Sequence, residues 1–397
     1  MSRTIGVVTG ARSDYGLLRP LLALLDADPT FDLRLFVTGM HLSPRFGMTV
    51  GEIEADGYSI AARIPLPLDD DTEAGVTRAT AIAMAGFADA LAESRPDLLV
   101  VLGDRNETFA AAAAALLTRI PIAHLHGGEV TAGAVDDSLR HAITKMSWLH
   151  FTAAEPYRRR VIQLGEDPAR VFQVGALGVD NALALPKLSR EQLAADLGPV
   201  FGEKTALVTF QPVTLEAGGG QRQFAALAAA LERFGDLSVV ITMPNADAGN
   251  HEIADAIETL RARRPERVHV FTSLGSVRYL SLLALADVCI GNSSSGLIEA
   301  PSLATPTVDI GDRQAGRERA PSVVHCDPVA EEIAAAIATA LSPAMREVAA
   351  RCENPNGDGH AAERIAVVLR RAVADVGELK KAFFDLPAAC FPPETRS

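Results

Sequence analysis

The chain has 397 residues, which is too long for one ordinary hydrophobic core and indicates two domains. Hydrophobic residues make up 48% of the sequence and aromatic residues 5%, a balance typical of a globular α/β protein, so a disordered or fibrous chain is excluded. The net charge of −13 argues against a protein whose main partner is nucleic acid, because that function needs a dense surface of lysine and arginine.

The four cysteines, Cys289, Cys326, Cys352 and Cys390, lie far apart and form no CxxC pair. The sequence therefore predicts neither a disulfide framework nor a cysteine zinc site, and the thiols are typical of a reducing compartment. The N-terminal residues lack the apolar segment of a signal peptide, and the longest apolar run, at residues 109–117, is much shorter than a membrane span. We expect a cytoplasmic protein with no membrane partner.

Four short apolar runs in the first half of the chain are predicted to be strands, at residues 4–10, 32–39, 97–104 and 120–128. Longer segments separate them, in which apolar residues recur at helical spacing, as the leucines do in residues 17–25. Strands that alternate with helices indicate βαβ units and a parallel sheet.

The alternation stops after about residue 185, in a polar stretch punctuated by proline and glycine, and then restarts. Five further strands are predicted at residues 205–210, 237–243, 268–271, 287–292 and 305–311. We therefore predict two Rossmann-like, doubly wound α/β domains that face a cleft, in residues 1–185 and 186–376, followed by a tail at 377–397. The last helix of the second domain is a candidate for packing back on the first domain. In such sheets a ligand binds at the carboxyl ends of the strands.

The segment GNSSSGLIEA follows an apolar strand and begins a helical stretch. Free backbone N–H groups and the positive end of the helix dipole favour an anion there, and Ser293, Ser294 and Ser295 add hydroxyl donors before Gly296. Glu299 follows one helical turn later, where a carboxylate can accept hydrogen bonds from ribose hydroxyls. A serine N-cap without any ligand explains the same pattern.

Polar groups also follow two strands of the first half. Asp104 and Arg105 come at the end of one, where ligands bind in open α/β sheets, although an aspartate there can simply cap the next helix. His124 and His126 share one side of the next strand, and Glu129 follows its Gly-Gly turn. Two histidines and a carboxylate suit zinc, but the HxH pattern is weak and no third strong ligand is obvious, so we expect no metal. A histidine that contacts substrate and titrates near neutral pH is the favoured interpretation.

The next helix begins with Asp136 and Asp137 and carries Arg140 and His141. Paired aspartates can be mere helix caps. Here, however, Asp104, the histidine strand end and the aspartate pair come from consecutive loops at one edge of one sheet. Acid and base groups of a catalytic site converge in this way, so the sequence predicts acid/base chemistry at this edge.

Three other segments provide candidate binding residues. Arg12 lies in the first βα loop, which usually faces phosphate, and Asn245 and Asp247 follow a strand of the second half. The last predicted strand is followed by a cationic segment that contains Arg313, Gln314, Arg317 and Arg319. Such a segment is either a solvated surface or, beside a phosphate site, a substrate clamp.

With these motifs in order, the chain resembles the hydrolysing UDP-N-acetylglucosamine 2-epimerases of sialic-acid biosynthesis and their relatives in the legionaminic-acid branch. The resemblance runs from Arg3 to about Val376. Its motifs are TGARSDYG, GMHLSPRFGMT, GDRNETFAA, HLHGGEVTAGAVDDSLRHAITKMS, MPNADAG, GNSSSGLIEAPS, IGDRQAGRERA and NPNGDGHAAERI.

The resemblance implies a glycosyltransferase-B-like fold, a homodimer or homotetramer, no cofactor, and a UDP-linked 2-acetamido sugar as substrate. The family reaction releases UDP and the 2-epimer as a free sugar. As the C1–O bond to UDP breaks, positive charge at C1 acidifies the C2 proton; a base removes it to give a glycal, and water adds back with inversion at C2. This chemistry needs a carboxylate base, a proton donor and cations for the departing diphosphate.

The motifs and the resemblance together give a set of predicted site residues. The catalytic groups are Asp104, His126, Asp136 and Gln211, and the substrate or nucleotide contacts are Arg12, His41, Arg105, Glu129, Asn245, Ser293, Ser294, Ser295, Gly296, Glu299, Arg313, Gln314 and Arg317. His124 is expected to be structural. Two positions depart from the family pattern: some members have Glu at the position of His126, and many have His at that of Gln211. Glutamine cannot exchange a proton near neutral pH, so its role either becomes positional or falls to His126 or an aspartate.

Two alternatives stay open at this stage. One is a non-hydrolysing epimerase or a glycosyltransferase on the same fold, and the other is a nucleotide-sugar sensor without turnover, since a fold alone fixes no function. The choice between N-acetylglucosamine and a 2,4-diacetamido-2,4,6-trideoxy sugar, and between UDP and GDP, depends on loops that the sequence does not position.

Overall fold

A computed structural model of the chain describes residues 2–70, 72–131, 135–211, 219–244, 250–374, 379–387 and 390. The chain forms two compact units, each built on one parallel sheet. The first unit comprises Met1–Glu129, Ser138–Val174 and Ala362–Ser397, and the second comprises Val130–Asp137 and Gly175–Ala361.

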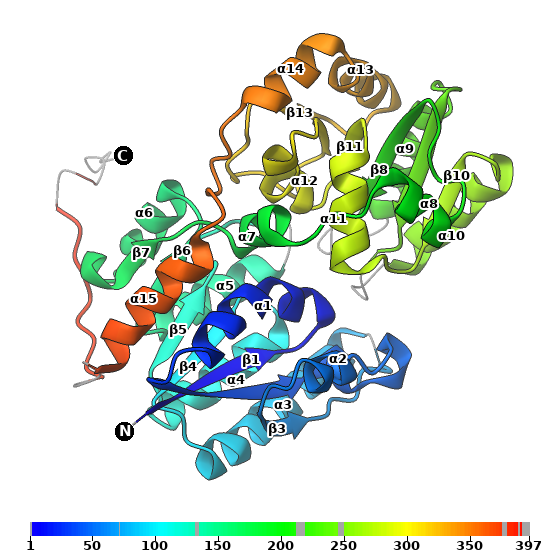
Figure 1. Cartoon of the computed structure of the whole chain (residues 1–397). Coiled ribbons are helices and arrows are strands. Elements are labelled where there is room, and N and C mark those ends of the chain that lie inside the picture. The colour runs from blue at the N-terminus through cyan, green and yellow to red at the C-terminus, as the bar shows by residue number, and fades with distance from the viewer. Residues whose placement is uncertain are drawn as a thin grey trace, which may run out of the picture. The chain divides into compact units, whose positions relative to one another are not determined.

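The first sheet has seven strands in the order β3-β2-β1-β4-β5-β6-β7. The strands are β1 (Arg3–Thr9), β2 (Phe31–Thr38), β3 (Ile60–Ile64), β4 (Leu98–Leu102), β5 (Ile122–Leu125), β6 (Leu149–Thr152) and β7 (Val171–Gln173). The helices of this unit are α1 (Arg12–Asp26), α2 (Val50–Ala55), α3 (Glu73–Glu93), α4 (Asn106–Leu117), α5 (Val135–Met146), α6 (Glu155–Gln163) and α15 (Ala361–Ala374), with a 3-10 turn η1 (Gly39–Leu42) after β2 (Figure 1).

Both faces of this sheet are covered by helices, which explains its unbroken apolar strands. All five residues of β4 are buried. Leu99 and Val101 belong to a core formed with α3 and α4, and α1 and α15 lie over the near face of the sheet in Figure 1. Because β1 is flanked by β2 and β4, the strand order reverses between β1 and β4, although all the strands stay parallel. In such sheets the loops that follow the two strands at this point diverge, and ligands bind between them.

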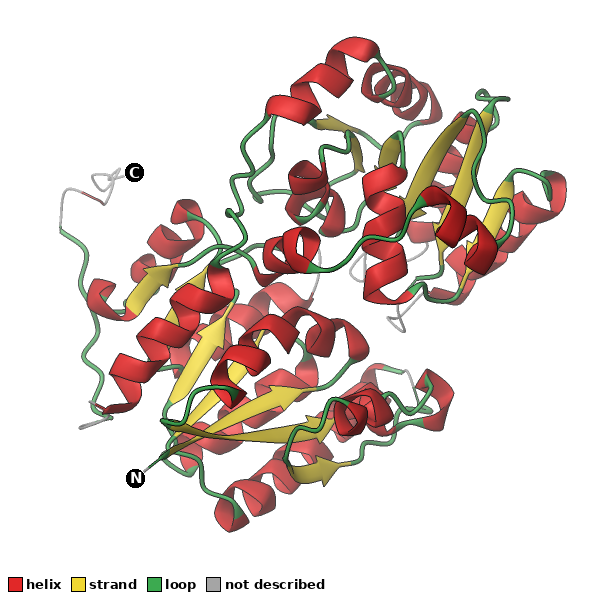
Figure 2. Cartoon of the chain, viewed as in Figure 1, coloured by secondary structure: helices red, strands yellow, loops and turns green. Residues whose placement is uncertain are grey.

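The second sheet has six strands in the order β10-β9-β8-β11-β12-β13. They are β8 (Lys204–Thr209), β9 (Leu237–Thr242), β10 (Val268–Phe271), β11 (Val288–Gly291), β12 (Thr307–Ile310) and β13 (Val323–Cys326). Helices again cover both faces, as Figure 2 shows: α7 (Leu177–Ala184), α8 (Arg190–Leu197), α9 (Gly219–Leu231), α10 (Asn250–Arg263), α11 (Gly275–Leu285), α12 (Ser295–Ile298), α13 (Ala330–Ala340) and α14 (Pro343–Arg351), with a 3-10 turn η4 (Ala300–Leu303).

Alternate residues of β8 and β9 face these two helical layers. Ala206 and Val208 pack in the core formed with α9, α10 and α13, whereas Leu207 and Val240 pack in the core formed with α8 and α11. The reversal of this sheet lies between β8 and β11. The prediction of two parallel α/β sheets is confirmed.

Within the described part of the chain, no single helix is both long and apolar enough to cross a membrane. The helices α13 and α14 are long and apolar enough only when they are counted together, and the angle between them is 68°. This concerns length and composition only. The four cysteines are free, with Cys289 and Cys326 buried.

Gly291, at the end of β11, allows β11 to approach β8 closely. Its φ is 142°, and a Cβ atom there would lie 1.9 Å from the Thr209 carbonyl oxygen. We expect Gly291→Ala to lower the free energy of unfolding by more than about 2 kcal/mol, measured by urea denaturation. The matched control is Gly235→Ala in the same unit, where a Cβ meets no atom within 4 Å. Equal stability of the two variants would contradict this account.

Candidate active site

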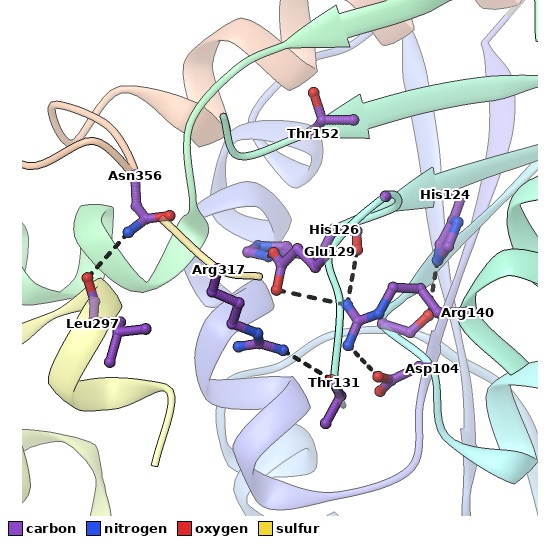
Figure 3. A network of polar contacts seen from close by, with 12 residues as sticks. Asp104, His124, His126, Glu129, Thr131, Arg140, Thr152, Leu297, Arg317 and Asn356 are labelled. Carbon is purple, nitrogen blue, oxygen red and sulfur yellow. Dashed lines mark hydrogen bonds and ion pairs between the residues drawn. The ribbon is translucent and has the colours of Figure 1, made fainter. Parts of the chain in front are cut away.

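The polar residues of the first unit gather around the ends of β4 and β5 (Figure 3). Arg140, from α5, is at the centre: its guanidinium contacts the Asp104 carboxylate and donates to the His126 carbonyl oxygen at 2.9 Å. The same guanidinium lies 3.6 Å from the Glu129 carboxylate. Arg140 is only 4% exposed, so these charged hydrogen bonds lie away from water, where each is strong and fixes its partner.

His126 has an unusual backbone conformation and one ring nitrogen without a partner. Its φ is 62°, a left-handed value that few non-glycine residues adopt and that is enriched at functional sites. The Nδ1 atom donates to Glu129 at 2.7 Å, whereas Nε2 is buried and has no hydrogen-bond partner among the described residues. A buried polar atom without a partner is uncommon, and a ligand group that hydrogen-bonds to Nε2 would satisfy it.

Two other histidines are fully buried, with both ring nitrogens occupied. His124 contacts the Gly103 carbonyl at 2.7 Å and the Thr144 hydroxyl at 3.1 Å, and burial lowers its pKa to about 3. His41 contacts the hydroxyls of Thr9 and Thr49 at 2.9 and 2.8 Å, and burial lowers its pKa to about 4. Both are therefore neutral at pH 7, and they hold together the turns that carry the site.

A second group of charges lies at the reversal between β1 and β4. Arg105 donates to the buried Glu107 carboxylate at 2.7 Å, and Glu107 packs against Gly10, where a Cβ atom would lie 2.6 Å from its oxygen. Asp14, in the first turn of α1, is near this group: burial raises its pKa to about 6, the Arg105 charge opposes the shift, and the Glu107 carboxylate adds to it. A carboxyl group with such a pKa can hold or release a proton near neutral pH.

Other predicted residues of this region have different surroundings. Arg12 forms an ion pair with Glu52 of α2 at 2.9 Å and is about half exposed. Asp136 is partly buried in the first turn of α5, whereas its neighbour Asp137 accepts a hydrogen bond from the Thr131 backbone N–H at 2.9 Å. Of the aspartate pair, Asp137 therefore fixes the backbone of Thr131.

In the second unit, Asn292 links the ends of β8 and β11. Its amide exchanges two hydrogen bonds with the Gln211 backbone, at 2.7 and 2.8 Å, and its carbonyl accepts from Arg313 at 3.0 Å and from Gln314 at 2.8 Å. Asn292 is fully buried. Asn292 thus joins three predicted residues at the sheet reversal, Gln211 through its side chain and Arg313 and Gln314 through its backbone carbonyl.

The serine segment forms only a short helix. The α12 helix covers Ser295–Ile298 and passes into η4, where Pro301 cannot continue the α-helical hydrogen bonding. Ser293 and Ser294 are half-buried at its start, and Gly296 is buried. The Glu299 carboxylate packs against Gly178, where a Cβ atom would lie 2.3 Å from its oxygen.

The cationic segment after β12 is largely occupied by protein contacts. Arg317 donates to the Val130 carbonyl at 2.9 Å and to the Thr131 hydroxyl at 3.2 Å, and Arg319 donates to the buried Asp309 at 2.8 Å. Asn245 lies outside the described residues. In the parts of the chain that the structure describes, no group of three or more histidine, cysteine or acidic residues has the arrangement of a metal site.

The predicted site residues do not include three residues that organise these groups, Arg140, Asn292 and Glu107. For Arg140 the available signal is its spacing four residues after Asp136, on the same helix face. Asn292 and Glu107 look like ordinary polar residues at strand and helix ends, so only their burial shows their importance.

Comparisons with known proteins agree with this architecture. A family model described as UDP-N-acetylglucosamine 2-epimerase matches residues 23–370. The chain is 38% identical over 371 residues to UDP-N,N'-diacetylbacillosamine 2-epimerase (hydrolyzing) of Legionella pneumophila, covering 93% of this chain and 96% of that protein. It is 37% identical over 325 residues to GDP/UDP-N,N'-diacetylbacillosamine 2-epimerase (hydrolyzing) of Campylobacter jejuni, covering 82% and 84%. The crystal structure of UDP-GlcNAc 2-epimerase from Neisseria meningitidis bound to UDP-GlcNAc superposes with a TM-score of 0.78 at 18% identity, covering 93% and 100%, which confirms the predicted fold.

Proposed function

The chain belongs to the UDP-N-acetylglucosamine 2-epimerase family, and we propose that it is a hydrolysing 2-epimerase of a nucleotide-linked 2-acetamido sugar. The observation that carries the proposal is the network of Asp104, Arg140, Glu129 and His126. Arg140 contacts the Asp104 carboxylate and the His126 carbonyl oxygen, and the His126 ring bonds to Glu129 while its buried Nε2 has no partner among the described residues. A proton-removing and a proton-donating group are what the reaction needs.

We propose that Asp104 accepts the C2 proton while the C1–O bond breaks and its electron pair leaves with the nucleoside diphosphate. The glycal that results has a C1–C2 double bond. Water then adds its hydroxyl group to C1. C2 receives a proton on the face opposite to the one from which the first proton was removed, which inverts that centre. We assign the proton donation to His126 through Nε2, and the hydrogen bond to the attacking water to Asp136.

Gln211 has a positional role in this scheme. Its amide side chain cannot exchange a proton, and its backbone is fixed by the buried Asn292. The departing diphosphate is assigned to Arg12, Ser293 and Ser294, with Glu299 accepting hydrogen bonds from the ribose. His41 and Arg105 of the first unit, and Arg313, Gln314 and Arg317 of the second, are assigned to binding the substrate or the nucleotide.

His126→Gln should lower kcat about 10²-fold, because glutamine keeps a hydrogen-bonding group but cannot transfer a proton. The matched control is His251→Gln, at an exposed position of α10, which should leave kcat unchanged. Release of the nucleoside diphosphate, followed in a coupled assay, measures both. Equal kcat for the two variants would remove His126 from the proposed mechanism.

The proposed substrate is the UDP-linked 2,4-diacetamido-2,4,6-trideoxy sugar. Support comes from the two relatives at 37% and 38% identity, which are named for N,N'-diacetylbacillosamine, whereas a UDP-N-acetylglucosamine 2-epimerase of Neisseria meningitidis is 31% identical. The product would then enter legionaminic-acid rather than sialic-acid biosynthesis. A cytoplasmic location and a homodimer or homotetramer are further parts of the proposal.

The test is proton NMR in D2O with a coupled assay for the nucleoside diphosphate. UDP-N-acetylglucosamine, the UDP-diacetamido sugar and its GDP counterpart are offered in parallel. Release of diphosphate with deuterium at C2 of a free manno-configured sugar is expected, fastest for the UDP-diacetamido sugar. Epimerisation with the nucleotide still attached would indicate the non-hydrolysing reaction, and binding without turnover of any substrate would indicate a sensor.

A further inference from the structure

Residues 379–387, called here the docked segment, lie against the first unit close to the C-terminal end of α5 and run beside β7 in Figure 1. The backbone N–H of Phe384 donates to the Gly165 carbonyl at 3.0 Å. The Phe383 ring packs on Gly165, where a Cβ atom would lie 2.3 Å from it, and the Lys145 ammonium lies 4.5 Å from the centre of the same ring. The docked segment therefore makes specific contacts with this surface.

Lys381 uses all three of its ammonium hydrogens in this contact. Its Nζ donates to the carbonyl oxygens of Lys145 and Ser147 at 2.6 and 2.8 Å, and it lies 2.7 Å from the Glu166 carboxylate. The carbonyls at a helix C-terminus lack intrahelical partners and carry partial negative charge, so an ammonium there stabilises the end of α5.

Glu166 is the buried carboxylate that binds the Lys381 ammonium. It is 1% exposed, and it also binds Lys145 at 2.8 Å and His150 at 3.0 Å. Burial raises the pKa of Glu166, but the hydrogen bonds from His150, Lys145 and Lys381 outweigh burial and hold the pKa at about 2. Glu166 is thus a fixed anion at pH 7, and removing one of its cations leaves a buried charge less well compensated.

The helix held in this way carries the centre of the candidate active site. Arg140 lies about 1.7 turns before the end of α5 and binds Asp104. Thr144 of the same helix binds His124 of β5. A helix moves as a rigid rod over such a distance, so a shift of its C-terminal end moves Arg140 and, with it, the Asp104 carboxylate.

We propose that Lys381 is a positioning residue, which docks residues 379–387 on the end of α5 and so keeps Arg140 in register with Asp104. Its effect on the reaction rests on the proposed function. Because misplacement of a catalytic group by about 1 Å can cost two orders of magnitude in rate, we expect Lys381→Met to lower kcat at least about tenfold. Of the residues assigned to the diphosphate and the ribose, Ser293, Ser294 and Glu299 belong to the second unit and Arg12 belongs to α1. None of them is carried by α5, so KM and UDP affinity should change little.

The experiment compares full-length Lys381→Met with Lys380→Met, its exposed neighbour and matched control. Steady-state kcat and KM are measured per folded enzyme, together with UDP affinity and the emission of Trp148, the only tryptophan of the chain, which follows Ser147 directly. We expect a lower kcat and a changed Trp148 emission only in Lys381→Met, with KM and UDP affinity retained. Lys381→Arg, which keeps the charge and the donors, should recover part of the lost kcat.

A wild-type kcat in Lys381→Met would overturn the proposal, whether or not the Trp148 emission changes. So would a loss of activity that is fully accounted for by a smaller folded fraction. If Lys381→Met does not fold, Lys381→Gln and Lys381→Arg are compared in the same assays. Equal kcat values for these two variants would contradict the proposal. Absence of UDP release by the wild-type chain refutes the proposed function instead, and the two failures are thereby distinguished.

Discussion

Asp104→Asn is expected to lower kcat/KM about 10³-fold, because the variant loses the base that accepts the C2 proton. The substitution keeps the size of the side chain. Arg140, which contacts the carboxylate of Asp104 and is buried, would keep a neutral amide as its partner, so the charge balance of the site also changes. The loss should appear mainly in kcat, because the proton transfer belongs to the chemical step rather than to substrate binding.

The same strand offers a matched control for this experiment. Asp97 precedes β4 at its amino end, where it accepts from Arg3 at 3.2 Å and from the Thr4 backbone N–H at 2.9 Å. Asp97→Asn makes the same chemical change at the opposite end of one strand and should leave kcat/KM unchanged. C2 deuteration and UDP release are measured in both variants. If they are as fast in Asp104→Asn as in Asp97→Asn, Asp104 is excluded as the base.

The interior of each sheet could be predicted from the sequence because buried parallel strands are continuous apolar runs. All residues of β4 and β9 are buried, and both were identified. The predicted strands do not include β3, β7 and β13, which lie at sheet edges. Only one residue in each of these strands is buried, so their sequences lack the apolar run that indicates a strand. The strand β6 was not predicted either, because His150 interrupts its apolar run. The buried partner of His150, Glu166, is brought next to it by the fold and could not be predicted from the sequence.

The site could be predicted in outline for a related reason. Motifs after successive strands must meet at one sheet edge, so Asp104, His126 and Glu129 could be placed in one region from their order alone. Which of their atoms are bonded could not be predicted, because this depends on the conformation of loops. The left-handed φ of His126 directs its Nδ1 to Glu129, and the burial of Asp14 that raises its pKa to about 6 arises from residues far apart in sequence.

Arg140→Met should have a large effect on both stability and activity. Arg140 is 4% exposed and is the cation between Asp104 and Glu129, and methionine leaves these carboxylates without it. Breaking a buried ion pair by removing one partner costs roughly 3–5 kcal/mol, which urea denaturation of the variant should reveal. Because Asp104 and the His126 backbone both lose the group that orients them, kcat should also fall by about 10²- to 10³-fold in the folded fraction.

Arg158→Met is the matched control, since Arg158 is an arginine of the same unit that donates mainly to the backbone carbonyls of Val171 and Pro168, at 3.0 and 3.3 Å. We expect a smaller loss of stability there and an unchanged kcat. The double variant Arg140→Met, Asp104→Asn separates the two roles of Arg140. If Arg140 acts through Asp104, the losses of kcat are not additive, and removing Arg140 from an enzyme that already lacks the Asp104 carboxylate costs little further activity. Full additivity would instead mean that Arg140 acts on the substrate independently of Asp104.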